Sequence, residues 1–138
     1  MSEPIKLVAF CGSLRKASFN RLALQAFAER LPAGAACETI EIDWLSRFTP
    51  QPFAGKPMAV FGASGGPLGT ARSQYHLRQM MIFLDGRFVN KPEVMIGAAP
   101  SKFADGKFTD EAGAKLLADL GASLVFAVRQ AKAAATVK

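Results

Sequence analysis

The stretch FCGSLRKASFNRLAL near the N-terminus gathers several side chains that can hold an anion. Ser13, Ser18 and Asn20 bring short hydrogen-bond donors, and Arg15 adds a planar charged group that suits phosphate geometry. A helix is expected to begin near Phe19, and the first N–H groups of a helix have no partners within it. We therefore predict a phosphate pocket here. In the alternative interpretation, Ser18 only caps the helix and Arg15 extends into water.

The pattern of this turn also limits the ligand. The sequence contains neither the GxxxxGK[ST] pattern of P-loop proteins nor the GxGxxG pattern of dinucleotide-binding proteins. A mononucleotide-like phosphate is therefore the predicted ligand.

A second glycine-rich turn lies in FGASGGPLGTARSQYH, residues 61–76, and formally matches the GxSxG pattern of hydrolase nucleophiles. That chemistry needs a separate histidine later in the chain, but the sole histidine, His76, follows the same turn on its helix. Serine hydrolysis is therefore disfavoured. The other interpretation is that backbone N–H groups of residues 64–66 lie close to a flat ligand, with glycine needed because side chains would collide.

Composition argues against several other functions. Cys11 and Cys37 form no CxxC pair and have no companion histidine, so neither a metal site nor a disulfide is expected, and both are predicted to be buried. The net charge of +6 favours anionic partners, but the basic residues are scattered without interleaved aromatics, which argues against nucleic acid. No apolar run reaches the ~20 residues of a membrane span, and no signal-peptide core is recognised, so a cytoplasmic chain without a membrane partner is expected.

The elements that must position the two turns alternate between apolar strands and amphipathic helices. Strands are predicted at residues 5–10, 37–42, 57–62 and 93–98, and helices at 20–31, 43–47, 70–84 and from near Thr109 onward. This alternation indicates an open parallel sheet with helices on both faces, because a crossover helix must join parallel strands. Ligands of such sheets bind outside the carboxyl ends of the strands, so both turns should lie on one rim.

The chain is long enough for one domain, predicted over residues 1–130, followed by a flexible C-terminal tail over residues 131–138. The helix Thr70–Leu84 brings Tyr75 and His76 close to other polar and basic side chains at helical spacing. We interpret this helix as a contact between subunits.

Four segments of the chain resemble the NADPH-dependent FMN reductase family, which includes chromate and quinone reductases. They are GSLRKASFNR, DWLSR, PFAGKPMAVFGASGGPLGTARSQYHLRQ and NKPEVMIG, and the match runs from about residue 5 to about residue 129. The resemblance implies a flavodoxin-like fold and assembly as a homodimer or homotetramer. It also implies that FMN passes electrons from NADPH to a small-molecule acceptor such as a quinone or chromate.

The resemblance further implies what the two turns do. In such proteins the first turn holds the FMN phosphate and the second borders the flavin ring. No catalytic side chain is implied, because the flavin itself accepts and donates hydride. The implied cofactor-binding residues are Ser13, Arg15, Ser18, Phe19 and Asn20 in the first turn and Ser64, Gly65 and Gly66 in the second.

The chain departs from the family at one place. Such proteins carry a helix, the central strand with a Pro-Glu-Tyr-Asn loop, and the start of another helix before DWLSR, whereas here Ile42 runs directly into Asp43. Typical element lengths put the missing segment at about 40 to 50 residues. The third strand of a flavodoxin-like sheet pairs with the first and the fourth, so its absence should expose two central edges.

Two functions follow from these observations. The first is an FMN-dependent NAD(P)H oxidoreductase. The alternative is a shortened, non-catalytic oligomeric protein that binds phosphate or binds FMN weakly, because the loop expected to hold the flavin ring is missing. An anion-binding regulatory domain is a third possibility, which phosphate protection against heat without flavin binding would reveal.

Overall fold

The computed structural model describes residues 4–11, 17–40 and 49–136 of the 138-residue chain. Within these ranges the helices are α1 (Phe19–Ala28), α2 (Ala71–Phe83) and α3 (Glu111–Thr136), and a 3-10 turn spans Ala99–Ser101. The strands are β1 (Ile5–Phe10), β2 (Ala35–Ile40), β3 (Pro57–Met58), β4 (Phe61–Ala63), β5 (Arg87–Phe88), β6 (Val94–Ile96), β7 (Phe103–Ala104) and β8 (Lys107–Phe108). Parallel strands that alternate with helices are consistent with a flavodoxin-like α/β fold.

The parallel sheet is divided into pairs of strands. β1 pairs with β2, β3 with β5, and β4 with β6, each pair in parallel, while β7 and β8 form a small antiparallel hairpin. Among the described residues, no strand pairing joins β1 to β4. Two central edges are therefore unpaired in this part of the chain, as the sequence predicts, although Ala63 on the β4 edge is only 5% exposed.

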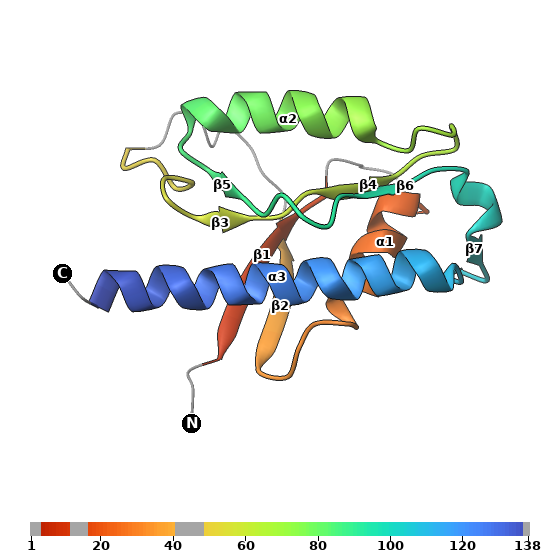
Figure 1. The fold of residues 1–138 in the computed structure, drawn as a ribbon. Helices are drawn as coiled ribbons and strands as arrows, with labels where there is room; N and C mark the ends of the chain where they lie inside the picture. The colour runs from red at the N-terminus through yellow and green to blue at the C-terminus, as the bar shows by residue number, and fades with distance from the viewer. Residues whose placement is uncertain (1–3, 12–16, 41–48, 137–138) are drawn as a thin grey trace.

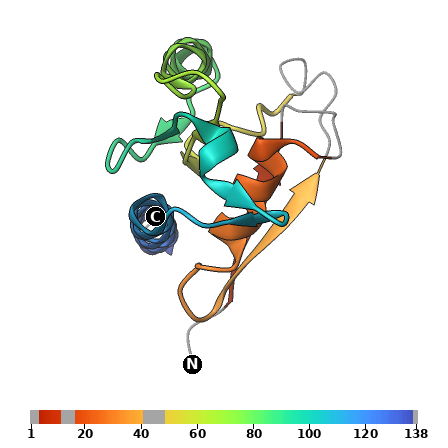
Figure 2. The same ribbon diagram turned by 90° about the vertical axis from the view of Figure 1, so that its right-hand side faces the viewer.

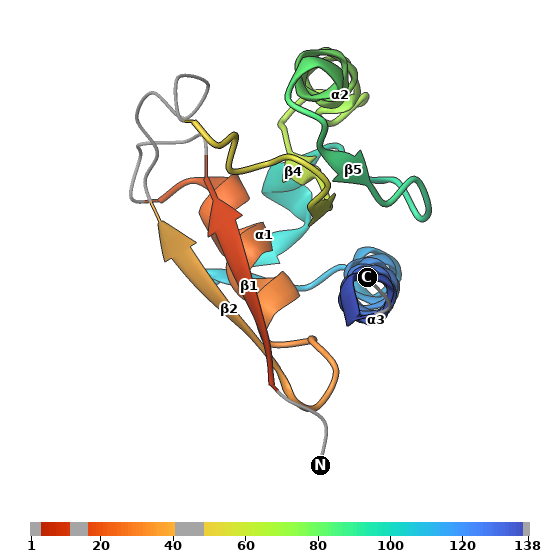
Figure 3. The same cartoon turned by 90° about the vertical axis from the view of Figure 1, so that its left-hand side faces the viewer.

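Helices lie on both faces of the strands β3 to β6, as predicted. α2 lies on one side of these strands and α3 on the other (Figure 1, and end-on in Figure 2). α1 packs against α3 and β4 beside the β1–β2 pair (Figure 3). β1 itself is covered on one face only, because Ile5 and Leu7 are buried whereas Val8 is 52% exposed. A central strand of such a fold is normally buried on both faces, so this exposure marks the side that lacks a cover.

The core lies where α1 and α3 meet the strands. Leu117 of α3 is fully buried, and the ring of Phe27 stacks on that of Phe61 with centroids 4.9 Å apart. Gly121 lets α3 approach α1 and the segment after it closely, since a Cβ there would lie 3.5 Å from Phe27 Cε2 and only 3.2 Å from Leu31 Cδ2. Burial of a large apolar side chain contributes about 1.5–3 kcal/mol. This junction therefore holds the N-terminal βαβ unit to the C-terminal helix.

Several predicted boundaries differ from the observed ones. α1 ends at Ala28, earlier than predicted, because the chain turns there and the Arg30 N–H donates to the Phe27 carbonyl oxygen at 3.1 Å. The single strand predicted at residues 57–62 is interrupted between β3 and β4. α3 continues to Thr136 and so includes most of the predicted tail. Fraying of this end and the domain boundary stay predictions.

The two cysteines are half-buried, so the prediction that they are buried was wrong. Cys37 lies on β2, which pairs with one strand only among the described residues and therefore leaves part of its flank open. Partial burial still raises the pKa of the Cys37 thiol. The residues 41–47, predicted to complete this strand and form a short helix, lie outside the described residues.

Candidate functional site

α1 begins at the first predicted turn, and Ser18 fixes its start. The Ser18 residue is 3% exposed, and its hydroxyl oxygen accepts a hydrogen bond from the Asn20 N–H at 3.2 Å. Its backbone is extended, with φ −74° and ψ 132°, as an N-cap residue requires. The capping role is therefore confirmed. The hydroxyl proton of Ser18 is a separate donor and could still serve an anion.

The Phe19 side chain packs into the protein. Its ring lies 5.2 Å from the ring of Phe103, which in turn lies 4.9 Å from the ring of Phe108. The ring thus anchors the start of α1 to the β7–β8 hairpin, and contact with a phosphate would come from the Phe19 backbone. Ser13 and Arg15 lie outside the described residues, and their predicted roles stay predictions.

Asn20 joins the two predicted turns directly. Its Nδ2 donates to the Ala63 carbonyl oxygen at 3.3 Å, and its Oδ1 accepts from the Ala63 N–H at 2.8 Å. The two residues are 43 positions apart in the sequence. The start of α1 and the end of β4 therefore lie side by side, so the described end of the first turn, residues 17–20, shares one rim of the sheet with the second turn.

The turn after β4 is braced by the neighbouring segment. The Ser64 N–H donates to the Ile96 carbonyl oxygen at 2.9 Å, and the Gly66 N–H donates to Ser64 Oγ at 3.3 Å. Within the described part of the chain, the Gly65 N–H has no acceptor, and a Cβ on Gly65 would meet no atom within 4 Å. Gly65 thus combines a spare donor with open space. The described protein atoms leave space for a side chain at position 65. A glycine would therefore be required there on steric grounds only if a ligand approached the backbone.

Gln74 is a polar residue that is only 2% exposed, and no motif in the sequence singled it out. Its Nε2 donates to Thr70 Oγ1 at 2.8 Å and to the Val94 carbonyl oxygen at 2.9 Å, which ties the first turn of α2 to β6. Thr70 precedes Gln74 by four residues, and side chains at this spacing are neighbours on a helix. The sequence could therefore have indicated the hydrogen bond between Gln74 and Thr70. No local pattern shows the bond to Val94, which is 20 positions away.

The structure also places the residues of the rival chemistries. His76 is exposed on α2, and among the described residues no hydrogen bond joins it to Ser64. In the same part of the chain, no group of three or more histidine, cysteine, aspartate or glutamate side chains could hold a metal ion. None of the helices described there is both long enough and apolar enough to cross a membrane.

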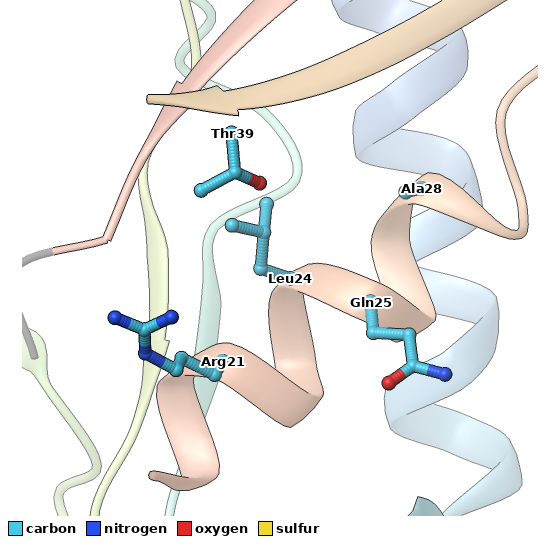
Figure 4. Close-up of a pocket in the computed structure, with 5 residues that line it drawn as sticks. All are labelled: Arg21, Leu24, Gln25, Ala28 and Thr39. Carbon is cyan, nitrogen blue, oxygen red and sulfur yellow. The ribbon is translucent and has the colours of Figure 1, made fainter. Parts of the chain in front are cut away.

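Two open hollows lie away from the two turns. One, of about 210 Å³, lies between α1 and β2 (Figure 4) and is lined by Arg21, Leu24, Gln25, Ala28 and Thr39. The other, of about 570 Å³, is lined by Pro4, Lys6, Val128 and Lys132. Neither hollow includes a residue predicted to bind a cofactor.

Together these features define a flavodoxin-like α/β protein in which a capped helix start and a glycine turn meet at the carboxyl ends of the strands. A family model described as NADPH-dependent FMN reductase matches residues 41–101. An NAD(P)H-dependent FMN reductase of Pseudomonas aeruginosa is 34% identical over 169 aligned positions, which cover 85% of this chain and 91% of the relative. The chain belongs to the NADPH-dependent FMN reductase family.

Two further similarities support this assignment. A quinone reductase of Escherichia coli is 32% identical over 155 aligned positions, covering 74% of this chain and 82% of the relative. The solved structure of FerB, a flavoenzyme NAD(P)H:(acceptor) oxidoreductase from Paracoccus denitrificans, matches with a TM-score of 0.76 and 21% identity. That match covers 91% of this chain and 98% of the FerB chain, and it shows the common fold.

The alignment with the Pseudomonas relative is longer than this chain. Because 85% of 138 residues is about 117, about 50 of the 169 aligned positions have no residue of this chain opposite them. This number agrees with the length of the segment that the sequence predicts to be missing before Asp43. The unpaired edges of β1 and β4 lie where the strand of that segment would pair.

Proposed function

We propose that the chain is an FMN-dependent oxidoreductase that transfers electrons from NADPH or NADH, through bound FMN, to a small-molecule acceptor such as a quinone or chromate. The observation that carries the proposal is the double hydrogen bond between Asn20 and Ala63, which sets a capped helix start beside a glycine turn. The names of the bacterial relatives, an FMN reductase and a quinone reductase, support the same chemistry.

The first turn fits the phosphate end of FMN. The buried Ser18 hydroxyl, the first N–H groups of α1 and the side chains of Ser13 and Arg15 would hold the phosphate. The net charge of +6 would attract this dianion over a longer range. α1 has no acidic residue in its first turn. The partial positive charge at the start of the helix is therefore not neutralised by a neighbouring carboxylate and can attract the phosphate.

The second turn fits the edge of the flavin ring. The spare N–H of Gly65 can donate to a ring acceptor, and the open space above this residue allows a flat group to approach the backbone. Ser64 and Gly66 would hold the shape of the turn through their own hydrogen bonds. FMN, when bound, supplies the redox chemistry by accepting hydride from the nicotinamide and giving electrons to the acceptor.

The proposal is tested by the visible absorption spectrum of the purified chain before and after FMN is added, together with its intact mass. An active flavoprotein of 138 residues keeps a flavin spectrum through dialysis and oxidises NADPH when a quinone is present. A chain of the same mass that takes up no flavin contradicts the proposed function.

A second function is favoured by the divided sheet. The edges of β1 and β4 are unpaired, and this chain lacks roughly 50 positions of the Pseudomonas relative. Both observations fit a shortened protein without catalysis. Such a protein would bind phosphate, or bind FMN weakly enough to lose it on dialysis. The dialysis step of the same experiment separates the two functions.

We also propose that the chain assembles as a homodimer or homotetramer through α2. Four large hydrophobic side chains are exposed on this helix: Tyr75 at 49%, Met80 at 61%, Ile82 at 77% and Phe83 at 89%. Exposed apolar groups of this kind, when contiguous, mark interaction sites on soluble proteins. A cytoplasmic location stays a prediction.

A further inference from the structure

We propose that Asn20 is a positioning residue, which fixes the ring-side turn against the phosphate-side helix start and does not itself hold the phosphate. This inference rests on the proposed function, because the two turns bind one ligand only if that ligand is a flavin nucleotide. It reassigns a residue that the family resemblance places at the phosphate.

The contacts of the Asn20 amide carry the inference. Oδ1 can only accept hydrogen bonds, so it cannot bind a phosphate dianion, and it accepts from the Ala63 N–H at 2.8 Å. Nδ2 is the one atom of the amide that could donate to phosphate, and one of its two N–H groups donates to the Ala63 carbonyl oxygen at 3.3 Å, so the amide plane is set by Ala63 and not by a ligand. The amide therefore pairs with both polar groups of one backbone residue, as a neighbouring strand would.

The surroundings of the amide hold it in this orientation. Ala63 is 5% exposed, so water cannot easily replace the two hydrogen bonds. On the other side, a Cβ on Gly62 would lie 3.0 Å from Asn20 Oδ1 and 2.7 Å from Thr70 Oγ1. Thr70 Oγ1 is itself fixed, because it accepts from Gln74 Nε2 at 2.8 Å. Rotation of Asn20 toward a phosphate would leave both polar groups of Ala63 without these partners.

The position of Ala63 explains why this contact matters for a flavin. Ala63 is the last residue of β4 and directly precedes Ser64, Gly65 and Gly66. β4 has no strand partner on the side of β1 among the described residues, so the Asn20 amide replaces one rung of the missing pairing. If this bridge is lost, the ring-side turn can shift against α1. Ligands with and without a phosphate should then bind less tightly by the same factor.

The test compares FMN with riboflavin, which has the same ring and no phosphate. Dissociation constants of both flavins are measured by fluorescence quenching for the full-length wild type, Asn20→Ala and the control Gln25→Ala. Gln25 is exposed on α1 and bonds only to Glu29 among the described residues. We expect Asn20→Ala to raise both dissociation constants about tenfold, equivalent to ~1.4 kcal/mol, so that their ratio is unchanged. Gln25→Ala should change neither.

A second readout follows the bridge without any flavin. Amide hydrogen exchange, measured by NMR on the flavin-free chain, should show the Ala63 N–H exchanging at least about tenfold faster in Asn20→Ala. If Asn20→Ala does not fold, Asn20→Asp is used in its place. It keeps an acceptor for the Ala63 N–H but sets a carboxylate against the Ala63 carbonyl oxygen, so riboflavin binding should again weaken.

Different failures give different results. A variant that loses affinity for FMN alone, with riboflavin unchanged, shows that Asn20 contacts the phosphate and overturns the inference while the proposed function stands. Unchanged exchange of the Ala63 amide also overturns it. A wild type that binds neither flavin removes the proposed function, and the inference with it.

Discussion

Gly62 and Gly65 lie close together in the sequence but have different surroundings. A Cβ on Gly62, within β4, would lie 2.7 Å from Thr70 Oγ1, whereas a Cβ on Gly65 would meet no protein atom within 4 Å. The first glycine is therefore required by the protein itself. The second is required only if a ligand approaches the turn.

This difference predicts opposite effects of two alanine substitutions. Gly62→Ala should lower the free energy of unfolding by about 1–3 kcal/mol, because Thr70 or Asn20 must move. Gly65→Ala should leave the stability of the flavin-free chain within about 0.5 kcal/mol of wild type, yet weaken FMN binding through the added methyl group. Urea unfolding and flavin titration of both variants measure the two effects. Equal FMN affinity in wild type and Gly65→Ala would place the ring elsewhere.

α2 is held to the strands beneath it mainly by polar groups. Gln74 is the helix's one buried residue and binds the Val94 carbonyl oxygen of β6. One turn further along the helix, Arg78 donates to Asn90 Oδ1 at 3.1 Å and to the Val89 carbonyl oxygen at 3.3 Å. Its Cζ also lies 4.7 Å from the centroid of the Phe88 ring. The apolar residues of the helix are left largely free of core contacts.

Arg78→Lys should therefore loosen α2 although the charge is kept. Lysine cannot reproduce the forked hydrogen bonds or the planar stacking on Phe88. We expect the variant to lose about 1–2 kcal/mol of unfolding free energy, whereas the control Arg72→Lys, at an exposed position of the same helix, should lose almost none. Thermal unfolding followed by circular dichroism checks this. An Arg78→Lys protein as stable as Arg72→Lys would show that the arginine contacts contribute little.

Comparison of these elements with the sequence shows what local patterns can predict. The structure confirms the strands predicted from the apolar runs around Leu7 and Val94 and the helix predicted from the spacing of Leu120 and Leu124. These elements were predictable because buried positions recur along the sequence with the period of the strand or helix. The partner of Asn20 is 43 positions away, and nothing near Asn20 in the chain indicates Ala63. The rim of the site was therefore predictable, whereas the role of Asn20 within it was not.

At the scale of the whole molecule, one missing segment has two consequences. The strand pairs β1–β2 and β4–β6 are joined across their unpaired edges by side chains and helices, among them Asn20, α1 and α3. The face of β1 that carries Val8 is also left open. Unpaired strand edges and exposed apolar groups favour association with other chains, so the proposed oligomer would add to the stability of this shortened domain.

The exposed side chains of α2 predict where the proposed association would take place. Ile82→Asp combined with Phe83→Asp should convert a homodimer or homotetramer into smaller species, because aspartates at these positions would be desolvated in the interface. The control is Phe126→Asp on α3, which removes an aromatic side chain of 61% exposure from another helix. Light scattering after size-exclusion chromatography gives the mass of each species. Since each chain carries a net charge of +6, added salt should strengthen the wild-type assembly by screening repulsion. A monomeric wild type, or an equal loss of mass with Phe126→Asp, would show that α2 is not the specific contact.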